Sequence, residues 1–262
     1  MTTSAARRFS ATAAAYAATM APSLRPVAAE VIRRARLGPN ERVLDLGTGT
    51  GIAAAAALGE GRRVTGIDAA TGMLEIARRE VPGATFREMD FGALEVDDAT
   101  VDVAIAAHSL LFATDQGAAL GEWLRVTRRG GRLSLSVPGP TEVTPTAIYG
   151  EIYDRYGIET DGRYPTAGTL AALAADAGWR DVQTATDPST AILLADPDAF
   201  RMWRAIGSRG AATAQLTTEQ QDELTDQMLA VTPRDVDGRL RIPFGTIYLT
   251  AHRSNANPDD GY

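Results

Sequence analysis

The chain has 262 residues, a formal net charge of −7 and a sequence pI near 5.0. This length is enough for one sizeable hydrophobic core, and an apolar content of 45% with 23% charged residues is typical of an ordinary globular protein. The acidic balance argues against a nucleic-acid partner, and no apolar run approaches the roughly 20 residues that a membrane span needs.

Two residue types are absent from the sequence, and a third is rare. Cysteine is missing, which excludes disulfides, thiolate metal ligands and cysteine nucleophiles. Lysine is missing, which excludes Schiff-base chemistry and a P-loop lysine. The histidines are His108 and His252 alone, so we expect no metal site.

The N-terminal region is predicted to form helices. Arg7-Arg8-Phe9-Ser10 resembles a twin-arginine export signal, but the Ala- and Thr-rich stretch after it lacks the leucine-rich core of such a signal, so we expect a cytoplasmic protein. We expect one helix over about 11–20, interrupted near Pro22, and a second over 26–37. Gly38-Pro39-Asn40 ends the second helix.

The central feature of the sequence is a buried strand over 42–46, a glycine-rich turn and an alanine-rich helix over 52–58. Three glycines at alternate positions let the backbone turn sharply and approach a ligand closely. The amides at the helix N-terminus suit a polar or anionic group. A second strand ends at Asp68, and an acid in this place accepts hydrogen bonds from ribose hydroxyls in nucleotide-binding βαβ units.

The glycines alone leave three interpretations open. Gly49, Gly51 and Ala54 fit the dinucleotide pattern G-x-G-x-x-A, which would indicate a nicotinamide-dependent oxidoreductase. A tight turn that binds no ligand is the second interpretation. Asp45 favours a third, because its carboxylate would repel a pyrophosphate and attract a cationic ligand. The run Asp45-x-Gly47-x-Gly49-x-Gly51 resembles motif I of the class I S-adenosylmethionine (SAM) methyltransferases.

The resemblance extends to three further places. Asp68 stands where the family has its ribose-binding acid, and the third strand, over 84–88, leads into Asp90 and Phe91 at the family's adenine loop. The family implies that Asp90 accepts from the adenine amino group and that Phe91 flanks the base. Taken alone, Asp90 is also typical of a helix N-cap beside a core phenylalanine. Tyr16 matches the family's tyrosine across the cofactor mouth, with an exposed tyrosine on a cap helix as the alternative.

His108 follows the fourth predicted strand, over 101–107. In doubly wound sheets, ligands bind at the carboxyl ends of the strands, near the point where the strand order reverses. We therefore expect His108 to face the reactive end of the cofactor, as a candidate catalytic base. The alternative is a histidine that only fills a polar gap under the loop.

The second half of the chain is predicted to add lids to the sheet. After a helix over 115–128 and the fifth strand, over 132–137, we expect lid insertions at about 140–165 and 197–231. Their aromatic residues supply the candidate substrate contacts, namely Tyr149, Tyr153 and Trp203. The same aromatic stripe is also typical of a helix that packs on a sheet.

The remaining elements complete the expected sheet. We predict a helix over 166–177, a sixth strand over 179–186 and a last strand over 244–251, which the resembled family inserts antiparallel. The fold class is therefore α/β, a Rossmann-like, seven-stranded, mostly parallel sheet with helices on both faces. We expect one domain over 1–253, with cap helices over 10–37, and a disordered tail over 254–262.

The sequence is similar to the small-molecule methyltransferases of the type 11, or UbiE-like, group. The resemblance implies an enzyme that transfers a methyl group from SAM to an O, N or C nucleophile of a small molecule and releases S-adenosylhomocysteine. We lean towards natural-product biosynthesis, and expect a monomer or homodimer with no nucleic-acid or membrane partner. A SAM-binding relative that does not methylate, cyclase-like or regulatory, is the alternative. The expected cofactor-binding residues are Tyr16, Asp45, Gly47, Thr48, Gly49, Gly51, Asp68, Ala69, Met73, Asp90, Phe91, Ala107 and His108.

Overall fold

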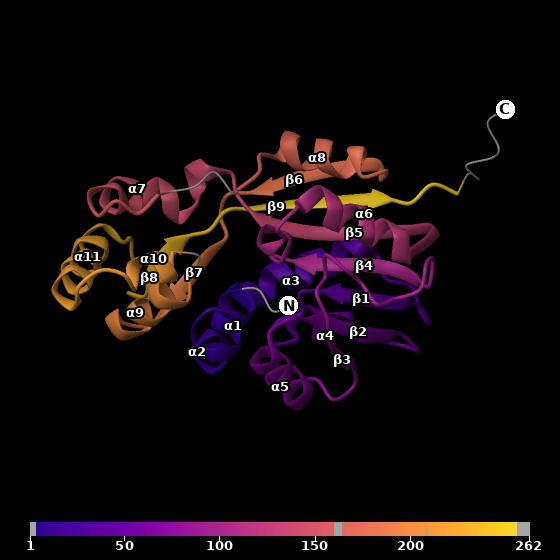
Figure 1. Ribbon diagram of the computed structural model, residues 1–262, viewed down its shortest axis with the longest axis horizontal. Helices are drawn as coiled ribbons and strands as arrows, with labels where there is room; N and C mark the ends of the chain where they lie inside the picture. The colour runs from indigo at the N-terminus through magenta and orange to yellow at the C-terminus, as the bar shows by residue number, and fades with distance from the viewer. Residues whose placement is uncertain (1–3, 160–163, 208, 256–262) are drawn as a thin grey trace.

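A seven-stranded sheet forms the centre of the computed structural model, which describes residues 4–159, 164–207 and 209–255 (Figure 1). Its strand order is β3-β2-β1-β4-β5-β9-β6. The strands are β1 (Arg42–Leu46), β2 (Arg63–Asp68), β3 (Thr85–Glu88), β4 (Val101–Ala107), β5 (Thr127–Pro138), β6 (Arg180–Asp187) and β9 (Thr246–His252). The first five pair in parallel, and β9 runs antiparallel between β5 and β6. The predicted mostly parallel sheet with an antiparallel last strand is confirmed.

The strands at the centre of the sheet are buried on both faces. Alternate residues of a strand point to opposite faces, so Val43, Val103 and Ile105 enter one core while Leu44 and Ala104 enter the other. This explains why these strands read as continuous apolar runs. The strand order reverses between β1 and β4, and their carboxyl ends therefore open a crevice at this edge of the sheet.

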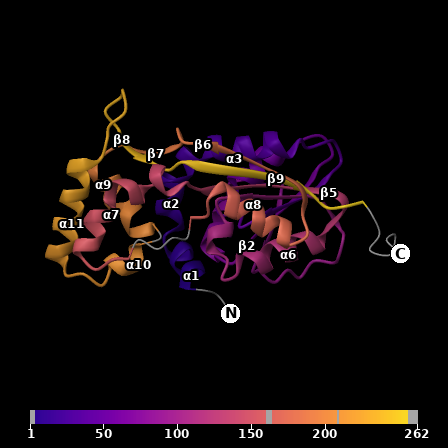
Figure 2. The same cartoon turned by 90° about the horizontal axis from the view of Figure 1, so that it is seen from above.

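Helices cover both faces of the sheet (Figure 2). The first core packs under three helices, and the second under two others. The first three are α3 (Ala21–Ala35), α4 (Ile52–Ala57) and α5 (Thr71–Glu80), and the other two are α6 (Gln116–Val126) and α8 (Ala167–Asp176). The predicted interruption near Pro22 is found at Met20, between α2 (Ala13–Thr19) and α3. The second helix starts at Ala21, earlier than predicted, because Pro22 is accommodated in its first turn, where no backbone N–H is required.

Two groups of elements extend the sheet beyond the carboxyl ends of its strands. The N-terminal group contains α1 (Ser4–Ala11) and α2 (Ala13–Thr19), where the sequence predicted one helix. The lid group contains α7 (Pro145–Arg155), α9 (Pro197–Ile206), α10 (Gly210–Thr213), α11 (Thr218–Val231) and the antiparallel pair β7 (Ala191–Leu194) and β8 (Leu240–Pro243). Short 3-10 turns, η1 (Leu110–Phe112) and η2 (Thr141–Val143), follow β4 and β5. Figure 1 shows the lid group to the left of the sheet, next to α1 and α2.

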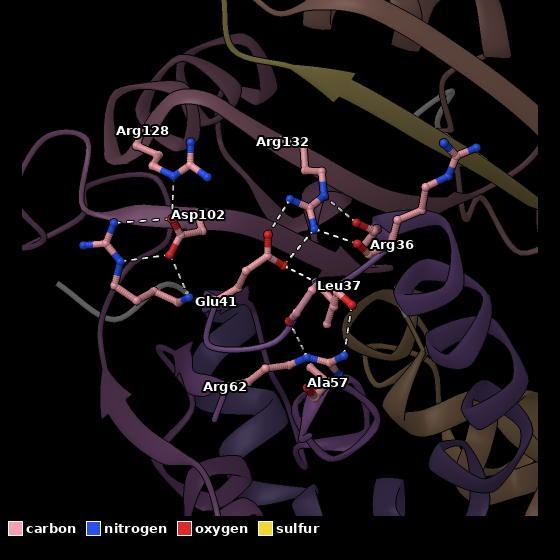
Figure 3. A network of polar contacts seen from close by, with 11 residues as sticks. Arg36, Leu37, Glu41, Ala57, Arg62, Asp102, Arg128 and Arg132 are labelled. Atoms are coloured by element: carbon pink, nitrogen blue, oxygen red, sulfur yellow. Dashed lines mark hydrogen bonds and ion pairs between the residues drawn. The ribbon is translucent and has the colours of Figure 1, made fainter. Parts of the chain in front are cut away.

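The opposite end of the sheet is tied by a polar network (Figure 3). Asp102 at the start of β4 accepts hydrogen bonds from the backbone N–H of Arg42 at 2.8 Å, from its Nε at 2.9 Å, and from Nε of Arg128. Arg132 of β5 donates two hydrogen bonds to the carboxylate of Glu41, both at 2.8 Å. The starts of β1, β4 and β5 are thus held together, which fixes where the same strands end.

The tail predicted over 254–262 lies, from residue 256 onward, outside the described residues. Among the residues that are described, no helix is both long enough and apolar enough to cross a bilayer.

Candidate active site

Two adjoining cavities open at the carboxyl ends of the parallel strands. The larger has a volume of about 1350 Å³ out to its open mouth, and the smaller, of about 380 Å³, lies behind the glycine-rich turn. The residues that line both are Tyr16, Leu24, Gly47, Gly49, Ala107 and His108.

The glycines of the turn differ in what they do. An added Cβ at Gly47, whose φ is +71°, would come within 2.4 Å of the Ser109 Cβ, so the two loops can approach only because this side chain is absent. At Gly49, with φ +54°, a Cβ would meet no heavy atom within 4 Å, because it would enter the cavity. Gly51 lines neither cavity, and its φ of +84° serves the start of α4. The structure thus corrects the expected cofactor contact of Gly51 to a role in the backbone turn.

Asp45 is a buried acid with one unused oxygen. Its Oδ2 accepts a hydrogen bond from the Thr48 hydroxyl at 2.6 Å, while Oδ1 has no hydrogen bond of normal geometry among the described residues, although the Ala54 N–H of α4 also favours the charged carboxylate. Burial raises the pKa of this carboxyl to about 7. Thr50 Oγ1, on the same small cavity, is likewise buried without a partner in the described part of the chain. This cavity is therefore suited to a cationic or hydrogen-bond-donating group.

Asp68 joins the glycine turn to the next loop. Its Oδ2 accepts from the Gly49 N–H at 2.9 Å and its Oδ1 from the Ala70 N–H at 2.8 Å. Burial raises the pKa of Asp68, and these two backbone hydrogen bonds oppose the rise. Burial first, and then the charge of Asp68, raise the pKa of Tyr16, which lies on the same cavity wall. Ala69 and Met73 continue this wall.

The loop after β3 brings Asp90 and Phe91 to the larger cavity. Asp90 Oδ1 accepts from the Gly92 N–H at 2.9 Å, and no helix begins here, so the alternative of a helix N-cap is wrong. The Trp123 indole N–H donates to the Phe91 carbonyl at 2.8 Å, and the two rings meet edge to face with centroids 6.1 Å apart. The buried tryptophan thus fixes this loop from beneath.

His108 stands where both cavities meet, in a left-handed backbone conformation with φ +55°. Its N–H donates to the Ser136 carbonyl at 3.0 Å, and its Nε2 lies 3.2 Å from the Thr246 hydroxyl. Nδ1 is buried and has no hydrogen-bond partner among the described residues. Burial lowers the pKa of His108 to about 3, so the imidazole is neutral at physiological pH.

The lid supplies the far wall of the larger cavity, with Tyr153 and Trp203 among its lining residues. The structure does not bring Tyr149 there. Its ring is fully buried between α7 and α9, its hydroxyl is hydrogen-bonded to Thr232 Oγ1 at 2.7 Å, and it does not line the cavity. The expected substrate contact of Tyr149 is therefore corrected to a place in the core of the lid.

Some residues of the cavity wall were not predicted. They are the aromatic side chains of Phe9, Phe112 and Phe244 and the guanidinium groups of Arg204 and Arg209. Phe9 precedes the first helix that the sequence predicts, over about 11–20. A helical pattern places charged residues outward, so nothing in the sequence indicates that Arg204 and Arg209 face inward.

In the described part of the chain, no group of three or more His, Cys, Asp or Glu residues is placed to hold a metal ion.

Comparison with known proteins gives this site a family. A family model described as a methyltransferase domain matches residues 44–135, which include the glycine turn, Asp68, Asp90 and His108. The demethylmenaquinone methyltransferase of Beutenbergia cavernae is 34% identical over 163 residues, which cover 55% of this chain and 68% of that protein.

Solved structures share the fold at low sequence identity. The cyclase SpnF has a TM-score of 0.61 at 21% identity, over 88% of this chain and 82% of its own. Phosphoethanolamine N-methyltransferase 2 of Haemonchus contortus, in complex with phosphomonomethylethanolamine and S-adenosylhomocysteine, has a TM-score of 0.58 at 17% identity, over 87% of this chain and 52% of its own.

The nicotinamide interpretation of the glycine pattern is set aside, because the methyltransferase match spans the whole pattern. The buried acid with a free oxygen and the glycine that leaves room for a ligand fit SAM, which carries positive charge. With 34% identity over 68% of its relative, the chain belongs to the class I SAM-dependent methyltransferases and is an enzyme whose cofactor is SAM.

Proposed function

We propose that this enzyme transfers a methyl group to an O, N or C nucleophile of a small molecule in natural-product metabolism. One observation carries the proposal: a small polar cavity with an unpaired acid adjoins a large, mainly apolar cavity under a lid, and His108 stands where they meet. The first cavity suits the amino-acid end of the cofactor. The second has room for its nucleoside and for an acceptor.

The cofactor contacts are part of the proposal. Asp45 would hold the ammonium group at its free Oδ1, and Asp68 would accept from the ribose hydroxyls with lone pairs that its two backbone hydrogen bonds leave free. Asp90 and Phe91 would contact the adenine from the loop that Trp123 fixes. When bound, SAM supplies a methyl group made electrophilic by its sulfonium.

The chain's own residues would act mainly by position. Aromatic walls exclude water, and the loops at the strand ends hold the two ligands in a near-attack arrangement. His108 Nδ1 is free to accept a hydrogen bond from the acceptor's nucleophile. Its lowered pKa makes it a poor store for a proton, so acceptors that need no strong base fit this site best.

An acidic chain and a lid-covered cavity support a small-molecule acceptor over a nucleic acid. We infer one domain over 1–253, a cytoplasmic location, and a monomer or homodimer.

The test begins with calorimetric titrations of SAM, S-adenosylhomocysteine and NADH. Both adenosyl ligands should bind with micromolar affinity and NADH should not, and Asp68→Ala should abolish the binding. Asp198→Ala, at an exposed position of α9, is the control and should bind as the wild type does. Incubation with SAM and a panel of small nucleophiles should then release S-adenosylhomocysteine. Binding without any turnover across the panel would instead favour the non-methylating alternative.

A further inference from the structure

Two arginines of the lid enter the larger cavity without an ion-pair partner. Arg204 of α9 is only 8% exposed, and its Nε and Nη1 are buried with no hydrogen-bond partner among the described residues. Arg209, just after α9, has a buried Nε that likewise finds no partner in the described chain. Its Nη2 donates to the Thr146 hydroxyl at 2.9 Å. Neither guanidinium forms a salt bridge within the described ranges.

This arrangement is costly for the unliganded protein. A guanidinium cannot lose its charge at ordinary pH, so burial without an acid leaves the charge uncompensated. Burial lowers the pKa of Arg204, and Asp222 opposes this only through its charge. Other partly buried arginines have acceptors for their N–H groups: Arg132 is paired with Glu41, and Arg253 donates to three backbone carbonyl oxygens. The unpaired arginines are therefore a feature that an incoming ligand would satisfy.

The two arginines converge on one side chain. The Arg209 guanidinium lies 5.0 Å from the centroid of the Tyr153 ring. The charges of both Arg209 and Arg204 act on the Tyr153 hydroxyl, which lies on the cavity wall. A pair of guanidinium groups beside a phenol offers several donors to a single group of oxygen atoms.

We propose that the methyl acceptor carries an anionic oxygen group, a carboxylate or a phosphate ester, which Arg204 and Arg209 bind beside Tyr153. The rest of the acceptor then lies along the aromatic wall and reaches His108 with its nucleophile. This inference rests on the proposed function and gives it a substrate class. The cofactor's own carboxylate is the competing anion, but the smaller cavity, which suits the amino-acid end of the cofactor, does not include these arginines.

The test uses matched aromatic probes on protein saturated with S-adenosylhomocysteine. Benzoate, benzamide, phenyl phosphate and phenol are titrated by calorimetry into the wild type and into Arg204→Gln, Arg209→Gln and Arg201→Gln. Arg201 is the control, since it lies on the same helix, is half exposed and is paired with Asp198. At least one acid should bind about tenfold or more tightly than its neutral counterpart, and the two cavity variants should lose this preference while the control keeps it. The acid preferred, benzoate or phenyl phosphate, identifies the kind of oxyanion.

A second measurement separates ligand binding from folding. Arg204→Met removes a buried, unpaired charge, so its melting temperature should equal or exceed that of the wild type while acid binding is lost. A lower melting temperature together with no acid preference in the wild type would overturn the inference. So would equal binding of acids and neutral probes, or no binding by any probe. If Arg204→Gln lowers the affinity for S-adenosylhomocysteine as much as the affinity for benzoate, the arginine binds the cofactor and the inference is wrong. The proposed function would still stand, as long as the wild type binds S-adenosylhomocysteine.

Discussion

Asp45 couples the small cavity to pH. Its ordinary pKa is 3.8, and burial raises the pKa to about 7 in the folded protein. The empty folded state thus binds a proton that the unfolded state releases, and the stability that this proton contributes is complete below about pH 4 and is lost as the pH rises through about 7. The binding of a cationic ligand has the opposite pH dependence and is favoured at higher pH, because the ligand requires the charged carboxylate.

We therefore predict that S-adenosylhomocysteine binds more tightly as the pH rises towards about 7, by up to about tenfold per pH unit, and that binding then levels off. Calorimetry at several pH values measures this. Asp45→Asn should flatten most of the slope, with a remainder from Asp68, whose pKa is also raised. His108→Gln should keep the slope, because His108 titrates near 3. A wild-type affinity that does not change with pH would contradict the assignment of Asp45.

Gly49 allows a second prediction with a matched control. Gly49 and Gly238 both have positive φ, +54° and +78°, and at both an added Cβ would meet no atom within 4 Å. Alanine at either position should lower the free energy of unfolding by about 1–2 kcal/mol through backbone strain. Only Gly49 faces the cavities, so only Gly49→Ala should also weaken S-adenosylhomocysteine, by about tenfold or more. Denaturation and calorimetry of both variants measure the two effects, and equal affinity losses would show that the methyl group acts through strain alone.

The two walls of the site differ in how far the sequence predicts them. Asp45 is the penultimate residue of β1, Asp68 ends β2 and Asp90 follows β3. The ends of parallel strands converge at one edge of a sheet, so the grouping of these acids follows from local pattern. The lid wall depends on how helices turn against one another. Tyr149 and Tyr153 are one helical turn apart, yet only Tyr153 reaches the cavity. No spacing rule distinguishes the two without the helix packed against them.

At the scale of elements, the network around Asp102 holds three parallel strands in register (Figure 3). Hydrogen bonds from Arg42 and Arg128 hold the pKa of Asp102 well below its ordinary value of 3.8, despite partial burial. A lowered pKa contributes stability that is present above about pH 4 and is lost as the pH falls below it. Both arginine side chains are more than 40% exposed, so solvent screens much of this contribution.

We predict that Asp102→Asn lowers the free energy of unfolding by about 1–2 kcal/mol at neutral pH, because it weakens hydrogen bonds that join β1, β4 and β5. Chemical denaturation measures the difference, which should shrink towards about pH 3 as the wild-type carboxylate loses its advantage. Asp198→Asn removes an exposed ion pair on α9 and should change stability little at either pH. A loss that is the same at both pH values would show that packing, and not charge, is responsible.

The predictability of the fold follows the same division between local and distant contacts. The central strands are predicted from apolar runs with turn residues on either side. The antiparallel direction of β9 is predicted from the resemblance to the family. The pair β7 and β8 was not found, because its two short strands are almost fifty residues apart and Leu240–Pro243 ends in a proline. The predicted helix over about 11–20 corresponds to α2, and α1, which precedes it, is not predicted.

At the scale of the whole molecule, the N-terminal helices and the lid close the same cavity. Ser10 of α1 accepts a hydrogen bond from the Gly72 N–H at 2.7 Å, which ties α1 to the start of α5. On its other side, α2 packs against α9 of the lid. Tyr16 of α2 and Trp203 of α9 both line the larger cavity. Cofactor binding at the strand ends should therefore reduce local opening in both groups of elements.

Hydrogen exchange tests this coupling. We predict that S-adenosylhomocysteine slows amide exchange in the glycine turn, in α2 and in α9, because ligand contacts on the strand side reduce local opening of the helices that cover it. The outer helix α8, packed on the far face of the sheet, is the internal control and should not change. Trp203→Ala should abolish the effect in α9 and retain it in the turn, since it removes the lid's aromatic contact with the cavity. Slower exchange throughout the chain, α8 included, would mean that the ligand stabilises the protein globally and that the lid has no separate response.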